Sequence, residues 1–128
     1  MRMNLSGDSG FEPGDDAGQV TTGQLFAVMA FAAACLGFHW FSEAGWVPLL
    51  DSANLALHEA GHPLVGIFSE RLTVYGGTLF QLAFPVLAAL QFRRSANPAG
   101  IAAAVVWLGE NLFNIARYMA DARAQDLP

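Results

Sequence analysis

The alternation of apolar and polar positions divides the chain into a polar start and four predicted helices. Residues 24–42 contain no formally charged side chain, and nineteen such residues can cross a bilayer as one helix. Three further helices are expected: one over 49–68, one over the apolar run that follows Gly76-Gly77 and ends at Phe92, and one over 99–124. Because residues 1–23 are polar, acidic and rich in glycine, we expect a disordered tail there, followed by one helical domain over 24–128.

Two of these helices carry a polar stripe. On the 49–68 helix, a turn of ~100° per residue places Asp51, Asn54, His58 and His62 on one face. On the last helix, the polar side chains within an arc of ~120° are Glu110, Asn111, Asn114, Arg117, Tyr118 and Asp121. Polar groups at membrane depth face protein or a water-filled cavity. We therefore expect the two stripes to meet; the alternative for the second is a solvated face where the helix leaves the bilayer.

Composition places these helices in a membrane. Hydrophobic residues make up 54% of the chain and charged residues 13%, against about a quarter charged in soluble domains. The fold class predicted is an all-α integral membrane bundle of three to four hydrophobic helices, in contact with lipid, and we expect it in the cytoplasmic membrane of a bacterium. A net charge of −5, with no lysine, argues against nucleic acid as a partner.

The strongest chemical signal is the sequence His-Glu-Ala-Gly-His at the centre of the 49–68 helix. Positions four apart lie on the same helix face, so His58 and His62 can offer imidazole nitrogens to one metal ion. Zinc suits such ligands, and Glu59 is placed to accept a proton from the water that zinc activates. The alternative is a pair of histidines that only hydrogen-bond to neighbouring helices. His39 is a further candidate for the metal site, although its position favours the headgroup region.

A catalytic zinc site requires a third protein ligand. Four carboxylates outside the motif helix are candidates: Glu70, Glu110, Asp121 and Asp126. Glu70 lies off the ligand face and Asp126 lies beyond the last apolar turn. Glu110 and Asp121 are about 16 Å apart along one helix, so only one of them can reach the metal. Asn114 and Tyr118 lie on the same helix face as Asp121 and can orient its carboxylate. Asp121 is therefore the preferred third ligand, and Glu110 is the alternative.

These residues resemble the site-2 protease family of intramembrane zinc metalloproteases, or a small relative of it. The resemblance covers residues 49–124 and depends on the histidine motif, on Gly76-Gly77 before the next span and on the Asn and Asp residues of the last helix. It implies that His58, His62 and Asp121 bind zinc and that Glu59 activates water for peptide-bond hydrolysis. Residues expected to orient the ligands or to contact substrate are Asn54, Gly76, Gly77, Asn111, Asn114 and Tyr118.

The function predicted is zinc-dependent hydrolysis of peptide bonds in a membrane-associated protein or peptide. The alternatives are a zinc-binding membrane protein without activity and a membrane interaction protein. Gly76-Gly77 is expected to form an extended or tightly turned segment near another part of the chain, or a plain loop. Arg93-Arg94 is the compact basic cluster near a span. If the motif helix crosses the membrane, this places the 93–97 turn in the cytoplasm and both termini outside.

Overall fold

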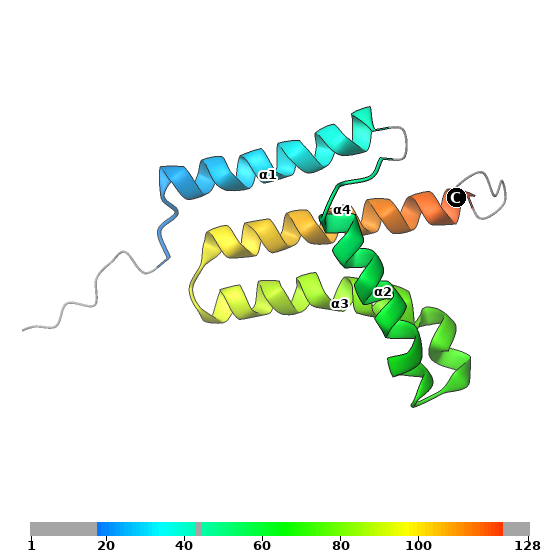
Figure 1. Cartoon of the computed structure of the whole chain (residues 1–128). Helices are drawn as coiled ribbons and strands as arrows, with labels where there is room; N and C mark the ends of the chain where they lie inside the picture. Colours follow the sequence, from blue (N-terminus) through cyan, green and yellow to red (C-terminus); the bar gives the residue numbers. More distant parts are fainter. Residues whose placement is uncertain (1–17, 43–44, 122–128) are drawn as a thin grey trace, which may run out of the picture.

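The computed structural model describes residues 18–42 and 45–121, and the regular elements of this part of the chain are all helices, joined by short turns (Figure 1). The elements in order are α1 (Thr22–Phe41), α2 (Leu50–Gly66), the short 3₁₀ helix η1 (Glu70–Leu72), α3 (Thr73–Arg94) and α4 (Pro98–Asp121). The described residues contain no strand, so the predicted all-α fold is confirmed. Most of the predicted tail, residues 1–17, lies outside the described residues, and its last two residues already belong to α1.

Local sequence explains where the helices begin. Thr21 accepts a hydrogen bond from the backbone of Gln24, and the Gln24 side chain accepts one from the backbone of Thr21, so a capping box starts α1. Pro98 is the first residue of α4, where its missing N–H costs nothing, and Asn97 Oδ1 accepts a hydrogen bond from the Gly100 amide at 2.9 Å. The turn predicted before residue 99 is therefore a helix N-terminus with its own cap.

α1, α3 and α4 lie side by side, and α2 crosses α4 and α3 at a steep angle (Figure 1). α4 lies between α1 and α3, and α2 packs against α3. The start of α1 lies at the same end of the molecule as the α3–α4 turn, where Gly18 approaches Ala96. The crossing of α2 brings the histidine motif against α3 and leaves the first turns of α2 beside α4.

α1, the segment Glu70–Arg94 and α4 are long and apolar enough to cross a membrane. α2 is not among these candidate spans within the described residues; it has 17 residues and includes Asp51 and Glu59. The topology with both termini outside depends on α2 crossing the membrane, and it stays a prediction. With α1, α3 and α4 as spans, the motif helix lies across the bundle instead of extending it.

The distribution of side chains fits lipid surroundings. Large apolar side chains are exposed over α1, α3 and α4, and Trp40 and Phe41 are exposed by 84% and 86%. The buried side chains, by contrast, are mainly polar: Asp51, Asn54, Gln81, Glu110, Asn111 and Asn114. An apolar exterior of this extent is typical of a membrane or protein interface. The interior is where the polar groups converge.

Candidate functional site

Two glycines allow the motif helix to touch α3 backbone to backbone. A Cβ added to Gly61 would lie 2.2 Å from the Gly76 carbonyl oxygen, and one added to Gly76 would lie 2.4 Å from the Gly61 carbonyl oxygen. Such distances exclude any larger residue unless the helices separate. The prediction of a loop or extended segment at Gly76-Gly77 is wrong, because both residues lie inside helix α3. The close approach expected of them is confirmed.

Both motif histidines are held through the same ring nitrogen. His62 Nδ1 donates to the backbone carbonyl oxygen of Thr73 at 2.8 Å, and His58 Nδ1 donates to Gln81 Oε1 at 3.2 Å. A carbonyl oxygen only accepts, so each Nδ1 carries the proton and each Nε2 presents its lone pair. The ring centroids are 4.9 Å apart. Histidines that bind metal are oriented by the same kind of hydrogen bond from the other ring nitrogen.

Gly77 makes room for the first of these rings. A Cβ at this position would lie 2.5 Å from His58 Nε2 and 2.6 Å from each of the ring carbons beside it. The two glycines therefore play different roles, since Gly76 contacts the backbone of α2 and Gly77 accommodates the imidazole. Below, His58, Glu59, His62 and Gln81 are together called the motif site.

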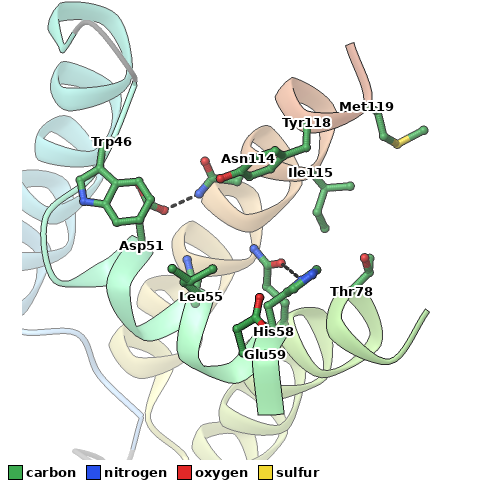
Figure 2. A pocket seen from close by; sticks show the side chains of 12 residues that line it. Trp46, Asp51, Leu55, His58, Glu59, Thr78, Asn114, Ile115, Tyr118 and Met119 are labelled. Atoms are coloured by element: carbon green, nitrogen blue, oxygen red, sulfur yellow. Dashed lines mark hydrogen bonds between the residues drawn. The ribbon is translucent and has the colours of Figure 1, made fainter. Parts of the chain in front are cut away.

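The motif site opens into a cavity of about 470 Å³. Figure 2 shows His58 and Glu59 on one side of it and Asn114, Ile115, Tyr118 and Met119 of α4 on the other. The remaining lining residues are Trp46, Asp51, Asn54, Leu55, Thr78 and Gln81. Aspartate and glutamate are the charged residues in this lining, and apolar side chains alternate with amides and hydroxyls. A cavity of this size and composition suits an uncharged, partly apolar ligand.

A second group of polar side chains joins α2 to α4. Asn54 Nδ2 donates to Glu110 Oε2 at 2.8 Å, while Asn114 Nδ2 donates to both Asp51 Oδ1 and Glu110 Oε1. The indole nitrogen of Trp107 donates to Asn54 Oδ1 at 2.7 Å. These five residues are called the α2–α4 network below. The stripes on the two helices meet as predicted, through this network.

The third predicted ligand is not brought to the histidines. Among residues 18–42 and 45–121, no three His, Cys, Asp or Glu side chains form a group that could hold a metal. Asp121 is the last residue of α4, one turn beyond Tyr118, which lines the cavity. Glu110 is bound into the α2–α4 network, and Glu70 is exposed on η1. Asp126 lies outside the described residues.

The other predicted site residues have the following places. Asn54 and Asn114 hydrogen-bond within the α2–α4 network while also lining the cavity. Asn111 is fully buried, and its amide nitrogen donates to the Trp107 carbonyl oxygen at 3.2 Å. His39 lies on α1 with its ring centroid 5.0 Å from that of Phe113, away from the motif.

Sequence reasoning missed Gln81, which both supports His58 and lines the cavity. The signal was present in the sequence, because Gln81 is the amide within the otherwise apolar run from Leu79 to Leu90. A polar side chain inside a span is expected to have a function or a partner. Comparisons of the chain with protein-family models, with curated proteins and with solved structures found no match.

Proposed function

We propose that this chain is a membrane-embedded, zinc-dependent peptidase in which His58 and His62 bind the metal and Glu59 is the general base. The observation that carries the proposal is the pair of hydrogen bonds from the histidine Nδ1 atoms to Gln81 and Thr73. Histidines that only stabilise the packing of helices need no common orientation. Here both rings are fixed so that the nitrogen suited to a metal is the one without a proton.

The two imidazoles fit zinc, and the described residues do not complete a set of three ligands. Asp121 remains the predicted third ligand, supported by its place one turn beyond the cavity wall at Tyr118. A zinc ion supplies Lewis-acid activation of water and of the substrate carbonyl. The remaining chemistry belongs to the chain itself.

Glu59 performs the proton transfers in this proposal. It is exposed in the helix, and its carboxylate lies beside His58 at the cavity (Figure 2). It accepts a proton from the attacking water as the new bond to the carbonyl carbon forms. It then delivers that proton to the leaving nitrogen as the peptide bond breaks, so the carboxylate is regenerated.

The surroundings support a substrate that approaches from the membrane. The helices around the site expose apolar side chains, and the cavity wall from α4 includes Ile115 and Met119. We therefore propose a membrane-associated protein or peptide as substrate, and the cytoplasmic membrane of a bacterium as the location. Among the described residues the lining contains no arginine or lysine, which disfavours an acidic substrate segment.

Replacement of the base tests this function. Glu59→Gln keeps the size of the side chain but cannot accept the proton, so cleavage should fall by about 10²–10⁴-fold with zinc retained. The measurement is cleavage of membrane-inserted peptides in liposomes, followed by mass spectrometry. Glu70→Gln is the matched control, because Glu70 is exposed on η1 and should keep full activity.

A zinc-binding protein without peptidase activity is the second candidate, favoured by the two-ligand set of the described residues. It predicts that the wild type and Glu59→Gln both contain zinc and that neither cleaves any peptide. Cleavage by the wild type that is lost in Glu59→Gln would exclude this second candidate.

A further inference from the structure

Thr78 carries a hydroxyl group that has no hydrogen-bond partner among the described residues. A serine or threonine inside a helix commonly bonds to the carbonyl oxygen one turn earlier. Thr73 and Ser95, at the two ends of α3, donate in this way to the carbonyl oxygen four residues before them. Thr78 lies within the same helix and makes no such bond. Its hydroxyl is therefore available to a ligand.

The Thr78 side chain faces the cavity of the motif site. It belongs to the cavity lining, and Figure 2 shows it pointing from α3 toward Ile115 on the opposite wall. The side chain is half-buried, and its oxygen is not among the enclosed polar atoms that lack a partner. A ligand in the cavity can therefore accept a hydrogen bond from this hydroxyl.

Thr78 also lies on the side of His58 where a metal would be held. Nδ1 of this ring is hydrogen-bonded to Gln81, whereas Nε2 lies against Gly77, where an added Cβ would come within 2.5 Å of it. Thr78 directly follows Gly77, so their Cα atoms are about 3.8 Å apart. In Figure 2 the dashed hydrogen bond to His58 is on one side of the ring and Thr78 is on the other. Since zinc lies about 2 Å from such a nitrogen, a carbonyl group attacked at the metal is within reach of the Thr78 hydroxyl.

We propose that Thr78 is a further catalytic residue, whose hydroxyl donates a hydrogen bond to the carbonyl oxygen of the scissile peptide bond. The inference rests on the proposed peptidase function. As water attacks the carbonyl carbon, the electron pair of the C=O bond moves to the oxygen, and Thr78 stabilises the charge that develops there. When the C–N bond breaks, the pair returns to re-form the carbonyl, and Glu59 supplies the proton to the leaving amine. Thr78 itself neither gains nor loses a proton.

The surroundings of the cavity favour a neutral donor of this kind. Glu59 and Thr78 lie on opposite sides of His58, so proton transfer and the stabilisation of the oxygen come from different helices (Figure 2). The charged residues of the lining are acidic, so they do not stabilise a negative charge. The amide nitrogens of Asn54 and Asn114 already donate within the α2–α4 network. The Thr78 hydroxyl has no such competing partner.

Two substitutions at this position isolate the hydroxyl. Thr78→Val has nearly the shape of threonine without the hydroxyl, and Thr78→Ser retains it. We expect both variants to keep their zinc, and kcat to fall by about 10²–10³-fold in Thr78→Val alone, with KM near the wild-type value. Thr22→Val is the matched control, since it makes the same change at an exposed position of α1. Cleavage by Thr78→Val within about twofold of the wild type would overturn the proposal, as would an equal loss in Thr78→Ser.

A binding measurement keeps this inference separate from the peptidase proposal. The probe is a Leu-Ala peptide in detergent in which a phosphinate group replaces one peptide bond, with the tetrahedral shape and negative charge of the attacked carbonyl. The zinc-loaded wild type and Thr78→Ser should bind it about 10–100-fold more tightly than Thr78→Val, the range for a hydrogen bond to a charged group. Equal affinity in the wild type and Thr78→Val would remove Thr78 as the donor. A wild type that shows this difference but never cleaves a peptide would contradict the peptidase function alone.

Discussion

The two polar regions of α2 differ in how completely their groups are paired. In the α2–α4 network, Asp51 and Asn54 find partners on α4 and are both 2% exposed. In the motif site one turn later, the histidines and Gln81 are each hydrogen-bonded through one atom, and His58, Glu59 and Gln81 line the cavity. A fully paired buried network fixes a structure, whereas polar atoms left open at a cavity can bind a ligand. We therefore infer that the α2–α4 network stabilises the fold and that the motif site binds the ligand.

The largest effect should come from breaking the α2–α4 network. Glu110→Ala removes an acceptor that two asparagines share, which leaves buried donors without partners. We expect the free energy of unfolding to fall by about 3–5 kcal/mol, while any protein that folds retains zinc. Glu110→Gln keeps one acceptor oxygen and should lose less. Unfolding in detergent, followed by circular dichroism, measures both.

The opposite result would give Glu110 a role in metal binding and not in stability. If Glu110→Ala kept its stability and lost zinc, Glu110 would be the third ligand, which was the alternative that the sequence allowed.

The contact between α2 and α3 offers a second test, of intermediate size. Gly61→Ala forces a methyl group against the Gly76 carbonyl oxygen, so the helices must separate. Overpacking of this kind costs about 1–3 kcal/mol and should also displace His58 and His62 from Gln81 and Thr73. Gly109→Ala is the control on α4, where a Cβ meets nothing within 4 Å; it should stabilise by about 0.5–1 kcal/mol. Equal melting temperatures for both variants would contradict the close approach.

The smallest predicted effect concerns Asp121. Asp121→Ala should weaken zinc binding by about tenfold or more, equivalent to about 1.4 kcal/mol, with little change in the free energy of unfolding. Competition with a zinc chelator of known affinity measures the change. Glu70→Ala, also outside the motif helix, should leave zinc affinity unchanged. Unaltered zinc affinity in Asp121→Ala would require a ligand other than Asp121.

Apart from the start of α3, the sequence predicted the helices well, because turn residues separate the apolar runs and those of α1 and α4 have the length of a span. It also predicted that the stripes of α2 and α4 would meet. The partners could not be predicted, since a helical wheel gives the direction of a side chain around the axis but not its level along it. α2 crosses steeply, so only the middle of α4, from Trp107 to Asn114, reaches Asp51 and Asn54.

The glycine pair shows a second limit of sequence reasoning. Gly76-Gly77 has low helix propensity, which favoured a loop or extended segment. The tertiary contact with Gly61 and His58 outweighs that propensity, and nothing near residue 76 in the sequence indicates a partner fifteen residues earlier. For Gln81 the sequence does signal a polar group inside an apolar run, but it does not indicate that the partner is His58.

The central claim is that His58 and His62 bind zinc through the nitrogens left open by Gln81 and Thr73. The most direct measurement is the zinc content of purified protein, by elemental analysis, for the wild type, His62→Ala and His39→Ala. The claim predicts about one zinc per chain in the wild type and in His39→Ala, whose histidine lies beside Phe113 on α1, and little zinc in His62→Ala. Equal zinc in all three proteins, or none in the wild type after dialysis against zinc, would contradict it.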